Sequence, residues 1–240
     1  MGMFDILLSQ EGLDPVKWDY NIDIIMCIDA TGSMDPILDE VKKTALSFEG
    51  IFREAMESKG KSVDQLRVKV IAFRDYIIDT VPMLESKFFV LPSERNQFKN
   101  FLDAIEASGG GDEPENALEA IATALGSDWV TTGSKRRHVI LVFTDASALP
   151  LNERSGCKNY PTNLPKNLAE LGSWWEGASQ YYYSNYEPKS GRMVVFGPKK
   201  EPWIKMDTAW NRYWVSYSNE CGLDGTKIQD VIDLLVGSVQ

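Results

Sequence analysis

Oxygen-bearing side chains gather in residues 29–33, a short segment whose spacing suits metal binding. The segment reads Asp-Ala-Thr-Gly-Ser and directly follows the apolar run 22–28. Alternate side chains of an extended segment project the same way, so Asp29, Thr31 and Ser33 would offer one carboxylate and two hydroxyls to a common point. Hard oxygen ligands of this kind favour Mg²⁺ or a similar divalent cation. An alternative stays open at this point, in which Thr31 or Ser33 caps a helix and Asp29 only ends a strand.

Two more carboxylates occupy comparable positions further along the chain. Asp112 follows three glycines at 109–111, which permit backbone conformations and close approaches that other residues resist. Asp145 follows the apolar run 139–143. Asp112 also fits the cap of a helix whose first turn contains Pro114, and a cap does not exclude a role as a metal ligand.

Apolar segments of two kinds alternate along the chain and must position these side chains. Runs that are apolar on both faces predict parallel strands buried between helix layers, and helical spacing of apolar residues elsewhere predicts helices. The expected strands cover 22–28, 66–73, 88–91, 139–143, 193–196 and 214–217, and the expected helices cover 35–59, 93–108, 117–125, 168–175, 202–208 and 228–236. The alternation predicts an α/β fold with one doubly wound, mostly parallel six-stranded sheet and helices on both faces.

The three carboxylates are expected at one edge of this sheet, because doubly wound sheets bind ligands outside the carboxyl ends of their strands. Asp29 and Asp145 each end an apolar strand, and Asp112 lies on the connection between the two strands. Both strand-end carboxylates are therefore expected outside the core. The sole histidine, His138, precedes its strand at the opposite end, which indicates a structural or solvated role.

Length and composition fit a single large domain. The chain has 240 residues, 43% of them apolar, which is enough for a sizeable core. Residues 1–20 show no clear periodicity and are interpreted as an N-terminal lead-in, and residues 21–240 are interpreted as the domain. A long excursion at 146–190 separates two predicted strands and contains the aromatic run 181–183. Long connections at the functional edge of a sheet often carry binding specificity.

The net charge of −10 argues against general binding to nucleic acids or anionic membranes, which needs clustered Lys and Arg. The basic triplet 135–137 is interpreted as a solvated loop before a strand. Three cysteines, odd in number and widely spaced, favour a reducing compartment. No apolar run approaches the roughly 20 residues that cross a bilayer, and residues 1–10 do not resemble a signal peptide. Together these features predict a cytoplasmic protein.

With the three segments in this order at strand ends, the chain from about residue 20 resembles the von Willebrand factor type A (vWA) domain, in its intracellular bacterial-type branch. The metal-ion-dependent adhesion site (MIDAS) of that family joins an Asp-x-Ser-x-Ser loop, a Thr or in some branches an Asp after a glycine run, and an Asp after the fourth strand. Thr31 replaces the first Ser and keeps its hydroxyl. The resemblance implies a Rossmann-like fold with a metal site at Asp29, Thr31, Ser33, Asp112 and Asp145. Asp75 lies outside this motif and is expected only to buttress the loops.

The resemblance implies a binding module, or scaffold, and not an enzyme. A bound Mg²⁺, or Mn²⁺ or Ca²⁺, would complete its coordination with a carboxylate from a partner protein, and the 146–190 excursion would add contacts. The sequence leaves the oligomeric state open. One rival is a phosphatase of the haloacid-dehalogenase type with Asp29 as nucleophile, although Thr31 stands where such enzymes usually have a second acid. Another is a vWA domain that keeps the fold without binding metal.

Overall fold

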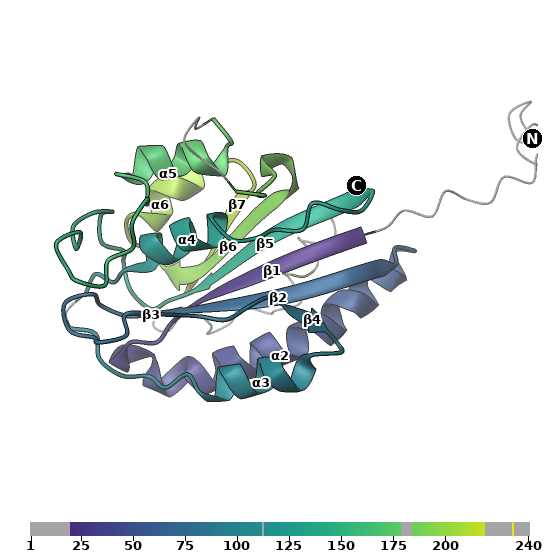
Figure 1. Ribbon diagram of the computed structural model, residues 1–240, viewed down its shortest axis with the longest axis horizontal. Coiled ribbons are helices and arrows are strands. Elements are labelled where there is room, and N and C mark those ends of the chain that lie inside the picture. The colour runs from purple at the N-terminus through teal and green to yellow at the C-terminus, as the bar shows by residue number, and fades with distance from the viewer. Residues whose placement is uncertain (1–19, 112, 179–183, 219–231, 233–240) are drawn as a thin grey trace, which may run out of the picture.

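A seven-stranded, mostly parallel sheet lies between two layers of helices in the computed structural model, which describes residues 20–111, 113–178, 184–218 and 232 (Figure 1). The strands are β1 (Tyr20–Asp29), β2 (Val63–Phe73), β3 (Met83–Glu85), β4 (Phe89–Leu91), β5 (Lys135–Phe143), β6 (Gly191–Pro198) and β7 (Tyr213–Ser218). The helices are α2 (Asp35–Ser58), α3 (Arg95–Asp103), α4 (Ala117–Leu125), α5 (Leu168–Trp175) and α6 (Trp203–Ala209), with short 3₁₀ turns η1 (Gly32–Met34) and η2 (Pro188–Ser190).

The central strand, β1, is buried along its whole length. The strand order is β3-β2-β1-β5-β6-β7, with β4 also paired to β2. β2 and β5 flank β1 and run parallel to it, whereas the short β3 and β4 run antiparallel to β2. α2 and α3 cover one face of the sheet, and α4, α5 and α6 cover the other (Figure 1). The α/β fold with helices on both faces is therefore confirmed.

Two connections diverge on either side of β1. The chain passes from β1 through α2 to β2 on one side, and it later passes through α4 to β5 on the other. α2 and α4 lie on opposite faces of the sheet, so the connections diverge at the carboxyl ends of β1 and β5 (Figure 1). Doubly wound sheets bind ligands at such a point. The predicted site lies at these carboxyl ends of the central strands.

Most predicted elements are present with ends shifted by a few residues, and three sequence interpretations are wrong. The sheet includes β3, which has only two apolar residues, both partly exposed, and therefore no apolar run; seven strands replace the predicted six. The basic triplet 135–137 is not a solvated loop, because it forms the first three residues of β5. Within it, Arg136 forms an ion pair with Glu187 at 3.1 Å. α4 begins at Ala117, so Pro114 precedes the helix instead of lying in its first turn.

Several sequence predictions fall outside the described residues. They concern residues 1–19 of the lead-in, the aromatic run 181–183, Asp112 and most of the C-terminal helix at 228–236. Within the part of the chain that is described, no helix combines the length and apolar character needed to cross a membrane.

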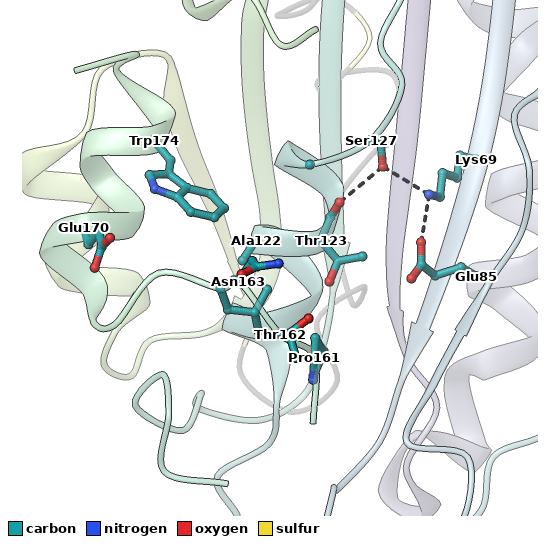
Figure 2. A pocket seen from close by; sticks show the side chains of 12 residues that line it. Lys69, Glu85, Ala122, Thr123, Ser127, Pro161, Thr162, Asn163, Glu170 and Trp174 are labelled. Carbon is teal, nitrogen blue, oxygen red and sulfur yellow. Dashed lines mark hydrogen bonds and ion pairs between the residues drawn. The ribbon is translucent and has the colours of Figure 1, made fainter. Parts of the chain in front are cut away.

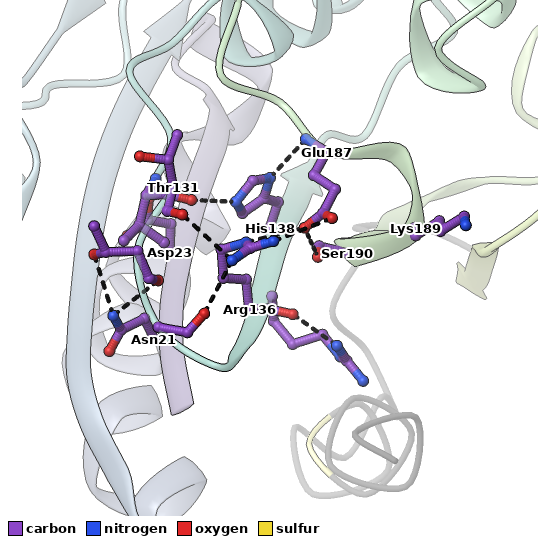
Figure 3. A network of polar contacts seen from close by, with 12 residues as sticks. Asn21, Asp23, Thr131, Arg136, His138, Glu187, Lys189 and Ser190 are labelled. Carbon is purple, nitrogen blue, oxygen red and sulfur yellow. Dashed lines mark hydrogen bonds and ion pairs between the residues drawn. The ribbon is translucent and has the colours of Figure 1, made fainter. Parts of the chain in front are cut away.

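The amino ends of the central strands are held together by a polar network (Figure 3). Arg67 donates two hydrogen bonds to the buried carboxylate of Asp23, at 2.7 and 2.6 Å. The backbone N–H of Val130 donates a third to Asp23 Oδ2 at 2.6 Å. A carboxylate that is fully paired in this way tolerates burial. The network ties β1 and β2 to the loop before β5, at the edge opposite the predicted site.

His138 belongs to the same network and is buried (Figure 3). The backbone N–H of Glu187 donates to His138 Nδ1 at 3.1 Å, so Nδ1 carries no proton. Nε2 then carries the proton and donates to the carbonyl oxygen of Val130 at 3.0 Å. Burial lowers the pKa of His138, because water no longer solvates the charged imidazolium. His138 is thus a neutral structural group, in agreement with its sequence interpretation.

Acidification should weaken the fold through His138. Because folding lowers this pKa, the unfolded chain binds one more proton below about pH 6.5, and stability falls by up to about 1.4 kcal/mol per pH unit. We expect the difference in unfolding free energy between the native protein and His138→Gln to shrink from about pH 7.5 to about pH 5.5 in urea denaturation. Since His138 is the only histidine, its ring-proton NMR signal reports the titration directly. A signal that titrates at about pH 6.5 or above would contradict the prediction.

Candidate metal centre

Asp29 and Asp145 follow neighbouring parallel strands at the same edge of the sheet. Asp29 is the last residue of β1, and Asp145 comes two residues after the end of β5. The two strands are in register there, with Ile28 opposite Phe143. The fold therefore brings both carboxylates to the point where the connections diverge, which is the usual ligand position of a doubly wound sheet.

Four of the five predicted ligands form one connected group, here called the oxygen cluster: Asp29, Thr31, Ser33 and Asp145. The Thr31 hydroxyl donates to Asp29 Oδ1 at 2.7 Å and lies 3.2 Å from Ser33 Oγ. Ser33 Oγ in turn donates to Asp145 Oδ1 at 3.1 Å. Thr31 precedes η1, but its side chain makes no capping hydrogen bond, which removes the capping alternative for that residue. The fifth predicted ligand, Asp112, lies outside the described residues.

The oxygen cluster runs from the core to the surface. Asp29 is 0% exposed, so the expectation that it lies outside the core is wrong. Its Oδ1 also accepts the Thr31 N–H at 3.0 Å, and its Oδ2 accepts the Thr144 hydroxyl at 2.7 Å. Burial raises the pKa of Asp29 to about 6, against the opposing effect of the hydrogen bonds from Thr31 and Thr144. Asp145 is half-buried and Ser33 is exposed, so the cluster meets solvent at that end.

The glycine run packs directly against the oxygen cluster. The Gly32 N–H donates to the carbonyl oxygen of Gly109 at 3.1 Å. Gly109 has φ of +66°, and a β-carbon there would stand 1.9 Å from Asp79 Oδ1. Gly110 has φ of +70°, and its β-carbon would stand 2.8 Å from that of Thr31. The predicted use of glycine for unusual backbone angles and close approach is confirmed at both positions.

Sequence reasoning missed Thr144, which bridges the ends of two strands. Its hydroxyl donates to Asp29 and accepts the N–H of Ala146 at 3.1 Å. The side chain therefore fixes the first turn after β5 to the last residue of β1. The available signal was a hydroxyl immediately before Asp145, at the end of an apolar strand.

Glu115 is a further carboxylate that the sequence did not assign to the site. It is 4% exposed, and its Oε2 has no hydrogen-bond partner among the described residues. Its Oε1 lies 3.2 Å from the position that a β-carbon on Gly110 would take. Burial raises the pKa of Glu115 to about 8, and the charge of Asp29 adds to the shift. A buried, unpaired acid next to the oxygen cluster is a group that a cation would stabilise.

The donors suit a hard divalent cation in their chemistry. All are oxygens, and Mg²⁺ needs few protein ligands because it retains several waters. Within the described residues, no three His, Cys, Asp or Glu side chains gather closely enough to form a metal site by themselves. A metal held here would therefore depend on the hydroxyls of Thr31 and Ser33 as well as on Asp29, Asp145 and Asp112.

Asp75 shapes a neighbouring loop and does not join the oxygen cluster. Its Oδ1 accepts the N–H groups of Ile77 and Ile78, at 2.5 and 3.2 Å. Its Oδ2 lies 3.7 Å from Arg154 Nε in the long excursion. These contacts agree with the buttressing role expected from the sequence.

The family model described as the von Willebrand factor A domain matches residues 23–159. This chain belongs to that family. The matched segment runs from β1 through β5 into the excursion, and it includes the whole oxygen cluster. The oxygen cluster is thus part of the vWA domain.

Known relatives resemble this vWA domain over only part of their own length. Alpha-protein kinase vwkA of Dictyostelium discoideum is 24% identical over 183 residues, which cover 75% of this chain and 28% of that protein. The pilus adhesin SpaC from Lactobacillus rhamnosus GG has a similar fold, with a TM-score of 0.54 and 10% identity over 92% of this chain and 30% of the adhesin. The open conformation of the same adhesin has a TM-score of 0.50 and 11% identity, over 96% of this chain and 30% of the adhesin. At these identities, the structural likeness concerns the fold alone.

Alanine at Gly110 should disrupt the loop that packs on the oxygen cluster. The positive φ and the close approach to Thr31 predict that Gly110→Ala lowers the unfolding free energy by about 1–3 kcal/mol. The matched control is Gly50→Ala, because Gly50 is exposed on α2 and an added β-carbon meets nothing within 4 Å. Gly50→Ala should be neutral or should raise stability by up to about 1 kcal/mol. Urea denaturation compares the two variants, and equal effects would contradict the constraint at Gly110.

Proposed function

We propose that this vWA domain is a metal-dependent protein-interaction module of the scaffold type. Its adhesion-type site would hold Mg²⁺, or Mn²⁺ or Ca²⁺, through the following residues: Asp29, Thr31, Ser33, Asp112 and Asp145. The observation that carries the proposal is the continuous oxygen cluster at the carboxyl ends of β1 and β5. Mediation of protein–protein interactions is typical of vWA domains, and the metal would supply an electrostatic anchor for a carboxylate of the partner.

The gradient of burial in the oxygen cluster supports this arrangement. Asp29 lies at the closed end, where it orients Thr31 and Thr144. Ser33 and Asp145 lie at the end that meets solvent, where a partner side chain can approach. We therefore assign Asp29 an anchoring role, and we place the partner on the side of Ser33 and Asp145.

The same burial argues against the phosphatase alternative. A nucleophilic Asp29 would need direct contact between one of its oxygens and the phosphorus atom of a substrate, which is much larger than a metal ion. Both oxygens of Asp29 accept hydrogen bonds from Thr31 or Thr144, and the residue is fully buried.

We propose a non-enzymatic, cytoplasmic module of the intracellular bacterial-type branch.

Calorimetric titration of chelator-stripped protein tests the metal site. Mg²⁺ or Mn²⁺ should bind with measurable heat and stabilise the fold, by about 2.7 kcal/mol when the free metal is at a hundred times its Kd. Asp29→Asn and Asp145→Asn should abolish both effects. Asp39→Asn removes the same charge from an exposed position on α2 and should bind metal normally.

Two outcomes would count against the proposal. The absence of heat and of any thermal shift in the native protein with either ion would favour a vWA domain without metal. Hydrolysis of p-nitrophenyl phosphate that requires Mg²⁺ and disappears in Asp29→Asn would favour the phosphatase.

The substitution Asp112→Thr tests the charge of the proposed site. Three carboxylates around a divalent ion leave a net charge of 2 − 3 = −1, whereas Thr at this position would leave zero. One added charge at about 4 Å is worth roughly 4 kcal/mol at an effective dielectric of about 20. We expect Asp112→Thr to weaken Mg²⁺ binding and, at saturating Mg²⁺, to strengthen binding of free acetate.

Glu113→Gln is the matched control, because Glu113 is 46% exposed and its carboxylate pairs with Lys200 at 2.5 Å. It should leave the affinity for Mg²⁺ unchanged. If Asp112→Thr also leaves that affinity unchanged, Asp112 is not a ligand and the charge argument fails.

A further inference from the structure

A cavity of about 790 Å³ lies on the face of the sheet that α4 and α5 cover (Figure 2). α4, α5, the β2–β3 edge and residues 161–164 of the long excursion line it. The four described members of the proposed metal site, Asp29, Thr31, Ser33 and Asp145, are not among the described lining residues. The volume falls within the range of pockets that bind small molecules or single side chains of a partner.

One wall of the cavity combines a carboxylate with an apolar surface. Glu170 and Trp174 project from successive turns of α5, and Figure 2 shows both on the same side of the cavity. Pro161 and Leu164 of the excursion extend the apolar part of this wall. A long side chain with an apolar stem and a charged head would find a matching surface for each part.

The opposite wall carries a balanced pair of charges. Lys69 is only 12% exposed, and its ammonium group donates to Glu85 Oε2 at 2.8 Å and to Ser127 Oγ at 3.1 Å (Figure 2). The charges of Lys69 and Glu85 therefore neutralise each other, which leaves the carboxylate of Glu170 as the unbalanced charge of the described lining. α4 ends at Leu125 beside this wall, and the negative end of its dipole also disfavours an anion there.

A second hollow, of about 290 Å³, continues from the cavity and shares Glu85 and Pro161 with it. Its far end includes Val81, in the loop that also carries Ile77 and Ile78. These three aliphatic side chains are each more than half exposed. An exposed apolar loop next to a continuous hollow favours a polypeptide segment over a compact small molecule.

We propose that this cavity receives an arginine side chain from an extended segment of a partner protein. The stem of the arginine packs against Trp174 and its neighbours, and the guanidinium donates to both oxygens of the Glu170 carboxylate. A planar guanidinium matches carboxylates with several donors, which an ammonium group cannot do in the same geometry. The net charge of −10 adds long-range attraction for a basic partner. This site goes beyond the metal-dependent function and needs no metal.

Short blocked peptides test the proposal on the full chain. The probe is acetyl-Gly-Arg-Gly-amide, and the matched peptide carries citrulline, which has nearly the same shape without the charge. Amide NMR titration should show the arginine peptide shifting signals of Thr123, Ser127 and Glu170, with an affinity about tenfold above that of the citrulline peptide. Binding should weaken with added salt, because exposed charges are screened.

Glu170→Gln is the decisive variant, because an amide oxygen can still accept the Lys166 N–H that Glu170 accepts at 2.8 Å. It should weaken binding of the arginine peptide by about tenfold without loss of helix content. Thr123→Trp, which fills the cavity from α4, should abolish binding. Glu54→Gln removes one exposed charge from α2 on the other face of the sheet and should change nothing.

Titrations with EDTA present, and in Asp29→Asn, separate this site from the metal site. Binding of the arginine peptide in both conditions supports the proposal even if metal binding fails. Equal affinity for the two peptides, or unchanged affinity in Glu170→Gln, would overturn it. Agmatine that binds about tenfold more tightly than the arginine peptide would also overturn it, in favour of a small-molecule cation site.

Discussion

The buried carboxylate of Asp29 is the constraint around which the functional edge of this vWA domain is arranged. A carboxylate that loses all contact with water needs hydrogen bonds or a cation, since unpaired burial costs several kcal/mol. Here the backbone and hydroxyl of Thr31 and the hydroxyl of Thr144 satisfy both oxygens. These bonds fix the turn after β1 to the turn after β5. The approach of Gly110 to Thr31 then fixes the glycine loop against both turns.

Buried charge is stabilised differently at the amino and carboxyl ends of the central strands. At the amino ends, Arg67 pairs fully with Asp23, and neutral His138 completes a closed network. At the carboxyl ends, no described cation neutralises Asp29, and Glu115 has an oxygen without a described partner. The amino ends are self-sufficient, whereas the carboxyl ends gather acidic groups without a described cation, at the position where such folds bind ligands. This contrast is the physical reason to propose a structural role for the amino ends of the strands and a binding role for the carboxyl ends.

Sequence patterns correctly predicted the features that depend on local periodicity. Apolar runs predicted the central strands, and alternate projection predicted that Asp29, Thr31 and Ser33 would converge. Tertiary contacts decided the rest. Arg136 lies in β5 and pairs with Glu187, which is distant in the sequence. Glu115 is buried, and its backbone N–H donates to the carbonyl oxygen of Ser147, in the segment that follows β5. β3 has only two apolar residues, both partly exposed, so no apolar run marks it in the sequence.

The oxygen cluster and the arginine cavity would select a partner by opposite signs of charge. A divalent ion at the oxygen cluster would attract carboxylates, while Glu170 would attract a cation on the face of the sheet that α4 and α5 cover. A segment with only one of these charges would satisfy one site and leave the other unpaired. Two linked contacts also raise affinity by effective concentration, provided that the segment spans both. Specificity in this arrangement therefore comes from the spacing of the two charges along the partner, more than from the strength of either contact.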